Sequence, residues 1–309
     1  MKILSGGIVL NLFNLAAFME IINENSISKA ASNLHMTQSA LSQQLKTIEN
    51  DLNCKLVERS NRGVRPTEAG DIVFRYSEIF LDLYENMMKE IEDSKKLELK
   101  EIKIGSSNSV CEYLIPCTLY TYRKKDRNIR FNTKCDYTKN VIDSVKSYRT
   151  DVGFITMEIE EPDIVCTKIE DHELVIIYSP ENNQMDNIKT LEELSHEGFI
   201  MGPEESGIRK VIEKTFEANG ISFNNVNIHM ELGSMEAIKT SVMENHGISI
   251  VPYVTAKKEL FTGTLKSKKI DGLNLKCDIC LIYLKGHGYS KHIKEFINYM
   301  EQFGSETFC

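Results

Sequence analysis

The sequence predicts three parts in order: an all-α module with a basic wing, a long helix, and a larger α/β domain. Apolar residues recur at helical spacing in two short stretches between about residues 27 and 52. The same spacing runs unbroken from about residue 69 to residue 91. From residue 102 onward, short apolar runs alternate with amphipathic stretches, which is typical of α/β domains.

Length and composition set the broad class of the protein. The chain has 309 residues, of which 41% are hydrophobic and 27% are charged, and its formal net charge is −8. These values are typical of a soluble globular protein with two or three domains. No apolar run approaches the ~18 residues of a membrane span, and polar residues interrupt the start where a signal peptide would need an apolar core. We therefore expect a cytoplasmic protein without a membrane partner.

The first predicted helices form a pair separated by a short break. Their buried faces carry, in order, Ile27, Ala30, Ala31 and Leu34, then Leu41, Leu45, Ile48 and Leu52. Thr37 is expected to cap the second helix, and Asn53 can take the left-handed conformation that ends it. Residues 11 to 25 have the same spacing and should pack behind the pair. This is the pattern of a helix-turn-helix.

The exposed face of the second helix is polar and has no acidic side chain. It carries Gln38, Ser39, Ser42, Gln43 and Lys46. Gln can bond bidentately to adenine, while Ser and Lys suit phosphates or several base edges. A basic segment with Arg59, Arg62 and Arg65 follows. Residues 26 to 65 hold six basic and three acidic side chains, a net charge of about +3 in an acidic protein.

This local charge points to duplex DNA as the partner of the module, although a solvated helix face remains the alternative reading of the polar strip. The residues expected to contact bases are Gln38, Ser39, Ser42 and Gln43. The residues expected to hold phosphates are Thr37, Lys46, Arg59, Arg62 and Arg65.

The long helix that follows carries an apolar seam with steps of three and four. The seam consists of Ala69, Ile72, Tyr76, Ile79, Leu83, Met87 and Ile91. A helix this long has nothing local to pack on, so a second copy of the chain is the expected partner. Packing on its own C-terminal domain is the alternative. The polar segment from residue 92 to residue 101 is interpreted as a hinge.

The stretch from Ser26 to Leu52, followed by Leu56, Glu58-Arg59 and Pro66 to Gly70, resembles the N-terminal signature of the LysR-type transcriptional regulators. The remaining length fits the sensor domain of that family. Departures from the usual pattern are Ser39 for Pro, Asn53 for Gly, Val57 for Phe and Pro66 for Leu. Each satisfies the local backbone requirements of the module.

The resemblance implies a winged helix-turn-helix domain over residues 1–67, a linker and dimerisation helix over 68–96, and an effector-binding domain over 97–304. That α/β sensor domain would consist of two Rossmann-like subdomains, as in periplasmic binding proteins: subdomain I from 97–162 and 266–304, and subdomain II from 163–265. The resemblance also implies promoter DNA and a small-molecule effector as partners, a homodimer that pairs into a homotetramer, and RNA polymerase as a further partner.

The α/β part contains eight strand candidates, which the alternation with helices assigns to a largely parallel sheet. The candidates are Ile102–Ile104, Ile129–Cys135, Val152–Ile155, Leu174–Tyr178, Phe199–Met201, Asn227–Leu232, Ile248–Val251 and Cys277–Leu284.

Ligands of such sheets bind at the carboxyl ends of strands, beside helix N-termini, which favour anions. Four segments of this kind are rich in Gly, Ser or Thr, and Ser109 with Glu112 has the spacing of a capping box. The expected effector-binding residues are Ser106, Ser107, Asn108, Thr156, Gly202, Pro203, Glu204, Ser206, Gly233 and Ser234. We expect a small anion there. Ordinary helix caps are the alternative for any one segment.

The sequence contains no residue pattern that is typical of a catalytic site or a metal site. We find no nucleophile with a base, no cofactor fingerprint and no ligand spacing among the seven histidines, so we expect neither an enzyme, a cofactor nor a metal site. The eight cysteines are scattered, and most are expected to be reduced. Cys277 and Cys280 lie on a strand and should point to opposite faces. A redox-responsive regulator that uses cysteines in place of a ligand remains the alternative function.

Overall fold

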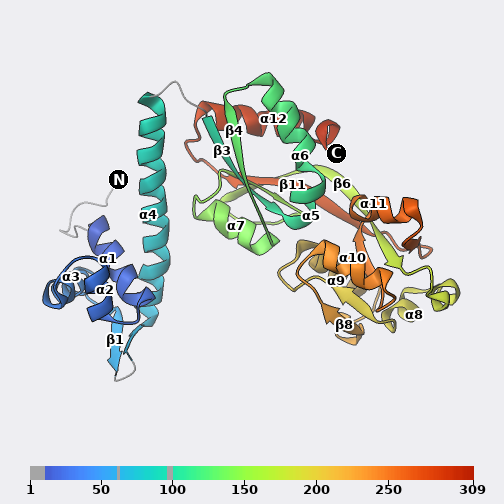
Figure 1. Cartoon of the computed structure of the whole chain (residues 1–309), viewed down its shortest axis with the longest axis horizontal. Helices are drawn as coiled ribbons and strands as arrows, with labels where there is room; N and C mark the ends of the chain where they lie inside the picture. Colours follow the sequence, from blue (N-terminus) through green and yellow to red (C-terminus); the bar gives the residue numbers. More distant parts are fainter. Residues whose placement is uncertain (1–10, 61–62, 96–99) are drawn as a thin grey trace. The chain divides into compact units, whose positions relative to one another are not determined.

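A computed structural model describes residues 11–60, 63–95 and 100–309 (Figure 1). The chain divides into two compact units, one up to residue 97 and one from residue 98 onward. None of the helices in the described ranges is both long enough and apolar enough to cross a membrane.

The N-terminal unit consists of three short helices, a β-hairpin and the long helix α4. The short elements are α1 (Leu12–Asn23), α2 (Ile27–Asn33), α3 (Gln38–Asp51), β1 (Val57–Ser60) and β2 (Gly63–Pro66). Their core contains Phe18, Ile21, Ala30, Leu41, Leu45, Ile48 and Leu56. The predicted cap of α3 is confirmed, because the Thr37 side chain accepts a hydrogen bond from the Ala40 N–H at 3.2 Å. Asn53 has a φ of 50°, as predicted.

Helix α4 (Glu68–Lys95) extends from the hairpin and packs against α1. Most of its predicted apolar seam lies in solvent within the single chain: Ile72, Tyr76, Leu83, Met87 and Ile91 are between 38% and 55% exposed. The predicted hinge is displaced, because residues 92–95 are helical and residues 100–101 already belong to strand β3. Residues 96–99 of that segment lie outside the described ranges.

The C-terminal unit is built on a mixed sheet with the strand order β10-β6-β11-β5-β3-β4, and β9 also pairs with β6. The strands are β3 (Lys100–Ser107), β4 (Ile129–Asp136), β5 (Val152–Ile155), β6 (Ile164–Tyr178), β9 (Ser249–Pro252), β10 (Lys266–Lys268) and β11 (Lys276–Leu284). A separate parallel pair is formed by β7 (Phe199–Met201) and β8 (Ile228–Glu231).

The prediction of a largely parallel sheet is wrong. β3 pairs in parallel with β4 and β5, but β11 runs antiparallel to both β5 and β6, and β6 runs antiparallel to β9 and β10. The reason is that β6 carries the chain from one half of the unit to the other and β11 carries it back.

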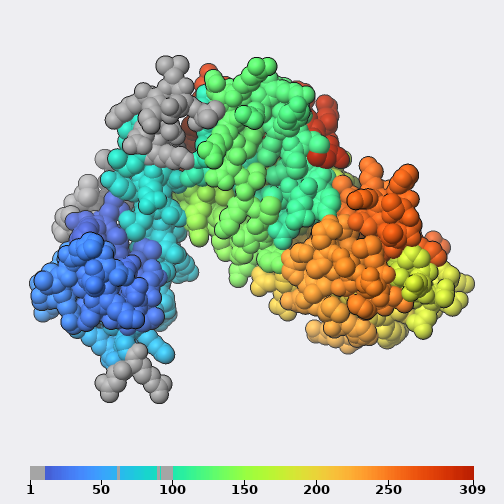
Figure 2. Space-filling view, viewed as in Figure 1, coloured from blue at the N-terminus to red at the C-terminus, as the bar shows by residue number. Residues whose placement is uncertain are grey.

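We call the half formed by β3 to β5, β11 and their helices the first lobe, and the half formed by β7 to β9 and their helices the second lobe. The first lobe has α5 (Asn108–Tyr113), α6 (Ile115–Lys125), α7 (Thr138–Lys146) and α12 (Lys291–Thr307). The second lobe has α8 (Leu191–Ser195), α9 (Gly207–Ala218), α10 (Met235–Met243), α11 (Tyr253–Thr262) and the 3₁₀ turns Asn183–Asn187 and Phe223–Asn225. In Figure 2 the green surface of the first lobe adjoins the orange surface of the second.

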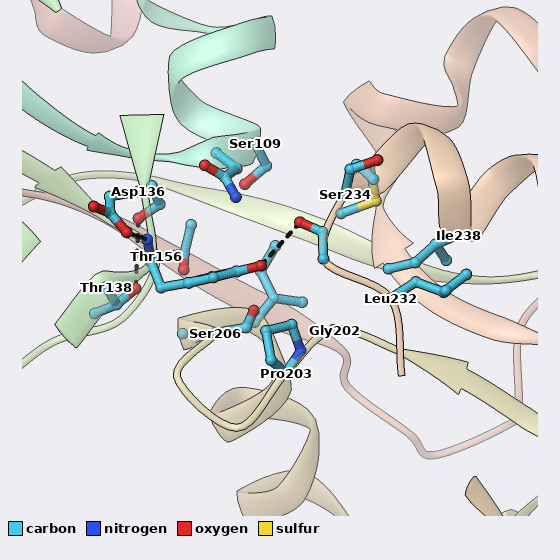
Figure 3. Close-up of a pocket in the computed structure, with 17 residues that line it drawn as sticks. Ser109, Asp136, Thr138, Thr156, Gly202, Pro203, Ser206, Leu232, Ser234 and Ile238 are labelled. Carbon is cyan, nitrogen blue, oxygen red and sulfur yellow. Dashed lines mark hydrogen bonds between the residues drawn. The ribbon is translucent and has the colours of Figure 1, made fainter. Parts of the chain in front are cut away.

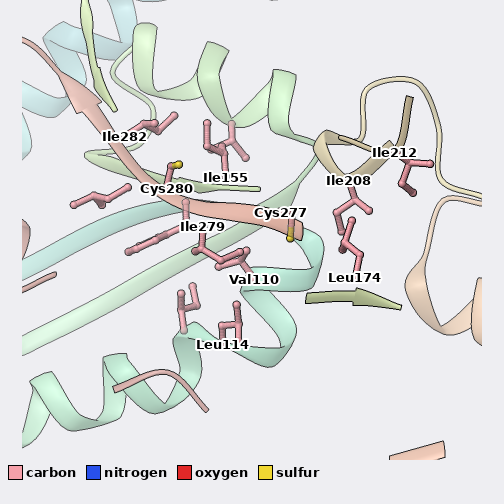
Figure 4. Close-up of a cluster of buried hydrophobic side chains, with 14 of the residues drawn as sticks. Val110, Leu114, Ile155, Leu174, Ile208, Ile212, Cys277, Ile279, Cys280 and Ile282 are labelled. Carbon is pink, nitrogen blue, oxygen red and sulfur yellow. The ribbon is translucent and has the colours of Figure 1, made fainter. Parts of the chain in front are cut away.

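One apolar core runs from the first lobe into the second. Figure 4 shows side chains of α5, β5 and β11 gathered around Ile279 and Cys280, with Ile208 and Ile212 of α9 at the other end of the cluster. Cys277 and Cys280 are both buried in this core and neither forms a disulfide. A bulge between Ile279 and Cys280 shifts the register against β6, so strict alternation does not hold there.

The expectation that most cysteines are unpaired is wrong. Two disulfides join Cys111 to Cys135 and Cys117 to Cys309, so only half of the eight cysteines are free. The first pair is 24 residues apart and the second 192. Such pairs are brought together by the packing of α5, β4, α6 and the chain end, and sequence spacing carries no sign of it.

Candidate functional site

The exposed face of α3 carries the side chains predicted to contact DNA. Gln38, Ser39, Gln43 and Lys46 are exposed and Ser42 is half-buried, because Leu41, Leu45 and Ile48 turn the opposite face into the core. The Thr37 and Ser39 hydroxyls lie 3.1 Å apart at the start of the helix. The structure therefore brings these predicted residues together at one end and along one side of α3.

The hairpin of β1 and β2 forms the wing. Arg59 lies opposite Val64 and Arg65 lies opposite Glu58, and both arginines are exposed. Arg62 lies outside the described residues. Gln38 and Arg59 line one hollow together with residues that the sequence analysis did not assign, Ser26, Ser28 and Lys29. The basic charge of Lys29 within the helix pair was the signal that could have found this part of the surface.

A buried carboxylate anchors the wing to α3. Glu49 is 7% exposed and accepts hydrogen bonds from Lys55 Nζ at 2.7 Å and from the Leu56 N–H at 3.0 Å. Burial by itself raises the pKa of Glu49, but these hydrogen bonds outweigh burial and hold the pKa below its usual 4.5. The wing strand that begins at Val57 is thereby held to the last turn of α3.

A pocket lies between the two lobes of the C-terminal unit (Figure 3), with a cavity volume of about 40 Å³. Eight of the ten predicted effector-binding residues line it: Ser107, Asn108, Thr156, Gly202, Pro203, Ser206, Gly233 and Ser234. The other two do not. Ser106 is fully buried and its hydroxyl donates to the Ser107 carbonyl, whereas the Glu204 side chain is 83% exposed.

Hydroxyl groups from both lobes converge in this pocket. The Ser107 hydroxyl donates to the Phe154 carbonyl at 3.1 Å and lies 3.5 Å from the Thr138 hydroxyl. The Thr156 hydroxyl oxygen is buried and has no hydrogen-bond partner within the described residues. A buried polar group without a partner costs about 1–3 kcal/mol, so a hydrogen bond from a ligand atom that reached this oxygen would be favourable.

Two helices of the second lobe begin at the pocket. The Ser206 side chain caps α9 and the Ser234 side chain caps α10, each by accepting a backbone N–H three residues on. Gly207 at the start of α9 approaches so closely that an added Cβ would lie 2.4 Å from the Thr138 hydroxyl and 2.5 Å from that of Thr156. The capping box predicted for Ser109 and Glu112 is wrong, because α5 begins earlier, with Ser107 in the cap position.

The sequence analysis missed part of the lining, most importantly Asp136, Tyr137 and Thr138. These residues follow β4, and Asp136 lies directly opposite Ser107 in the parallel pair of β4 with β3. The carboxyl-end rule that selected the other segments applies to β4 as well. It was not applied there because the segment lacks the run of Gly and Ser that marked the others.

Hydrogen bonds connect the lobes across the pocket mouth. The Tyr137 hydroxyl donates to the Gly233 carbonyl at 2.9 Å, and the Tyr113 hydroxyl donates to Glu236. Burial and the bond to Glu236 raise the pKa of Tyr113 to about 12, and the hydrogen bonds from Lys239 and Tyr113 lower the pKa of Glu236. This charge pattern keeps the phenol protonated, so that it can donate, and the carboxylate ionised.

Comparison with protein families assigns both units. A family model described as "LysR substrate binding domain" matches residues 95–304, and one described as "Bacterial regulatory helix-turn-helix protein, lysR family" matches residues 12–71. The chain is 31% identical over 277 residues to a protein of Cyanophora paradoxa named "Probable RuBisCO transcriptional regulator". That match covers 88% of this chain and 85% of the relative.

Solved structures show the same fold. The structure of full-length CbnR complexed with its target DNA matches with a TM-score of 0.70 and 18% identity, covering 95% of this chain and 99% of that one. The regulatory domain of CcmR from Synechocystis PCC6803, in complex with 2-PG, matches with a TM-score of 0.59 and 23% identity over 65% of this chain and 96% of that one. At these identities the likeness concerns the fold alone.

Proposed function

The chain belongs to the LysR family of transcriptional regulators, and on this basis we propose which of its residues bind DNA and which bind a small-molecule effector. It binds promoter DNA with its N-terminal unit and a small molecule with the pocket of its C-terminal unit. The proposed boundaries are those of the sequence analysis: a DNA-binding domain over 1–67, a linker helix over 68–96, and an effector domain over 97–304 that divides at 162 and 266.

The proposed DNA surface is the polar strip of α3 together with the wing. Gln38, Ser39, Ser42 and Gln43 contact bases in the major groove. Thr37, Lys46, Arg59, Arg62 and Arg65 hold phosphates. The observation that supports this assignment is that Gln38 and Arg59 line one hollow, so the side chain proposed to contact a base lies near the one proposed to hold a phosphate.

The test compares two substitutions on a duplex that the full-length protein selects from a random pool. Gln43→Ala should cost about 1–3 kcal/mol on the selected duplex and little on an unrelated one. Arg59→Ala should weaken binding to both duplexes and reduce the slope of log affinity against log salt concentration by about one. Arg127→Ala removes an exposed arginine of the other unit and should change neither the affinities nor the slope. Equal effects of Gln43→Ala on both duplexes would contradict the assignment.

The proposed effector is a small molecule with an anionic group. The N-termini of α9 and α10 and the open hydroxyl of Thr156 supply donors and positive partial charge in one place. A ligand that contacts both lobes shifts the population between their arrangements, which changes how the recognition helices sit on the promoter. Thermal unfolding of the full-length protein with a panel of carboxylates and phosphates tests this, because a ligand at ~100 times its dissociation constant adds about 2.7 kcal/mol.

The proposed assembly is a homodimer through the exposed seam of α4, and two dimers form a homotetramer. Activation would add RNA polymerase as a partner at the promoter. Since the family consists of transcriptional regulators, we propose no catalytic step and a cytoplasmic site of action on DNA.

A redox-responsive mode is a second candidate, and the Cys111–Cys135 disulfide favours it. The bond ties α5 to the end of β4, and both elements carry pocket residues. A dithiol reductant would convert the disulfide into two thiols, using two electrons and two protons, and release α5 from β4. Alkylation and mass spectrometry after controlled reduction, combined with DNA binding, test this mode. Unchanged DNA binding after complete reduction of Cys111 and Cys135 would exclude it.

A further inference from the structure

The pocket between the lobes contains the carboxylate of Asp136, which would repel a ligand that carries only negative charge. Asp136 lines it, and one carboxylate oxygen accepts from the Tyr137 N–H at 2.9 Å and from Asn140 Nδ2 at 2.6 Å. The other oxygen lies 3.8 Å from Lys134 Nζ, whose side chain is 69% exposed. This second oxygen is therefore only weakly compensated by a solvated cation.

The two helices that begin at the pocket each carry a cation that is already paired with carboxylates. Arg209 of α9 donates to Glu213 at 3.0 Å, to Glu231 at 2.6 Å and to the Gly202 carbonyl at 3.1 Å. Lys239 of α10 pairs with Glu236 at 2.8 Å and with Glu259 at 2.9 Å. Among the residues that line the pocket, all within the described ranges, none is Lys, Arg or His.

The surroundings of Tyr137 add to this acidic character. Burial raises the pKa of the Tyr137 phenol, and three carboxylates raise it further, those of Glu205, Asp136 and Glu231. A ligand that enters beside Tyr137 therefore meets a negative potential on that side. A cationic group of the ligand would be attracted there.

The part of the pocket at the start of α9 has the character of an anion site. The Thr156 hydroxyl is without a partner in the described structure, and the first turn of α9 at Gly207 has N–H groups that no acceptor within the helix can satisfy. The partial positive charge of a helix N-terminus, about half a unit, adds to these donors. A carboxylate fits this side.

The two sides are close together. Ser107 and Asp136 lie opposite each other on adjacent strands, whose backbones are about 4.8 Å apart. The Ser107 hydroxyl gives its proton to the Phe154 carbonyl, so it faces a ligand as an acceptor. Two acceptors side by side, Asp136 and Ser107, suit an ammonium group. The Thr138 hydroxyl lies 3.5 Å from that of Ser107, and the hydroxyls of Thr138 and Thr156 both lie beside Gly207 at the start of α9. The positions for the ammonium group and the carboxylate are therefore neighbours, as these groups are in an α-amino acid.

We propose that the pocket binds an α-amino acid, with its ammonium group held by Asp136 and Ser107 and its carboxylate held by Thr156 and the first turn of α9. This assignment rests on the proposed function, because it names the class of effector for the same pocket. Within the class of small molecules with an anionic group, it selects the zwitterions.

The experiment measures binding of the twenty L-amino acids to the full-length protein by calorimetry. Each amino acid that binds is compared with its matched 2-hydroxy acid and its matched amine, for example L-alanine with L-lactate and ethylamine. At least one amino acid should bind, and its 2-hydroxy acid and its amine should each bind at least ~10-fold more weakly, because each analogue lacks one of the two charged groups that the pocket would hydrogen-bond.

Two variants test separately the contacts of the ammonium group and of the carboxylate. Asp136→Asn keeps an oxygen for the Tyr137 N–H and should weaken the amino acid ~10-fold or more while leaving the 2-hydroxy acid unchanged or tighter. Thr156→Val should weaken both ligands to a similar degree without unfolding the protein, because the hydroxyl has no protein partner within the described residues to lose. Asp143→Asn, an exposed carboxylate on α7, is the control with the same charge change.

The outcomes distinguish this inference from the proposed function. If carboxylates or phosphates without an ammonium group bind and no amino acid does, the amino-acid assignment is overturned and the pocket remains an effector site. An Asp136→Asn variant that keeps the full preference for the amino acid also overturns it. If neither the amino acids nor the anions bind, both this assignment and the effector role of the pocket fail.

Discussion

The Tyr137 hydroxyl donates a 2.9 Å hydrogen bond to the Gly233 carbonyl, and it thereby joins the lobe that contains Asp136 to the lobe that contains α10. Because Tyr137 also lines the pocket, one of the contacts that join the lobes belongs to the pocket lining itself. A ligand that binds beside Tyr137 would therefore act on a contact between the lobes.

Removing this contact should weaken effector binding without unfolding the domain. Tyr137→Phe keeps the ring and loses one neutral hydrogen bond, worth about 0.5–1.5 kcal/mol, so affinity should fall about 2- to 10-fold. Calorimetry with any ligand that shifts thermal unfolding measures it. Tyr120→Phe is the control, because Tyr120 is 65% exposed on α6 and outside the pocket. Equal affinities of Tyr137→Phe and the wild type would show that closure does not depend on this bond.

Adding one methyl group at Gly207 should close the pocket. The new Cβ would lie 2.4 Å and 2.5 Å from the hydroxyls of Thr138 and Thr156, so these hydroxyls must rotate into the pocket or the start of α9 must shift. We expect Gly207→Ala to reduce effector affinity at least ~10-fold, while the N-terminal unit keeps its affinity for DNA. Gly288→Ala is the matched control, because nothing lies within 4 Å of its Cβ position. Unchanged effector binding by Gly207→Ala would place the ligand elsewhere.

A charge in the seam of α4 should dissociate the dimer. Leu83 is 38% exposed in the single chain, beside Met87 at 48%. Burying a carboxylate between two such helices is costly, so Leu83→Glu should raise the dimer dissociation constant by ~10-fold or more, measured by analytical ultracentrifugation. Glu85→Gln alters a polar exposed position of the same helix and should leave the dimer intact. A dimer that survives Leu83→Glu would assign α4 to packing on its own chain.

Acid should loosen the wing through Glu49. The folded pKa of Glu49 is below 4.5, so its contribution to stability is fully present above that pH and is lost as pH falls through the lowered pKa. Glu49→Gln should lower the free energy of unfolding of the N-terminal unit by about 1–3 kcal/mol at pH 7. Urea unfolding from pH 7 to pH 3 should show the difference shrinking below pH 4.5. Asp51→Asn, in the same turn of α3, serves as control, and a constant difference across this range would refute the role of the charge.

Local signals explain why the N-terminal unit was predictable. The caps and stops of α3, Thr37 and Asn53, act within a few residues of themselves, and the apolar spacing of a helix is visible in a short window. The first half of β6 was missed because its side chains alternate between charged and half-buried, with Lys168, Glu170 and Asp171 forming no apolar run. The antiparallel backbone ladder with β11 holds that segment in the sheet, and Lys168 pairs with Asp278 of β11 at 2.6 Å.

The pocket residues that follow a strand in a run rich in glycine and serine were predictable. Those that reach the pocket only through the pairing of neighbouring strands were not. Asp136 reaches the pocket because β4 lies beside β3 in a register that places it opposite Ser107. That register depends on contacts between residues about thirty positions apart, and the disulfide partners Cys111 and Cys135 depend on the same packing. Non-local pairing of this kind leaves no periodic trace in the chain.

The place of β11 in the sheet determines the order in which the protein can be made. β11 lies between β6 and β5, so the sheet stays incomplete until about residue 284 has left the ribosome, and Cys117 can pair only after Cys309 has been made. The helices and wing that read DNA need only the residues up to 95. At 5–20 residues per second, a nascent chain therefore carries its DNA-binding unit for about 10–40 s before the sheet of its effector domain can be completed. A truncated translation product would contain the DNA-binding unit without the effector domain that regulates it.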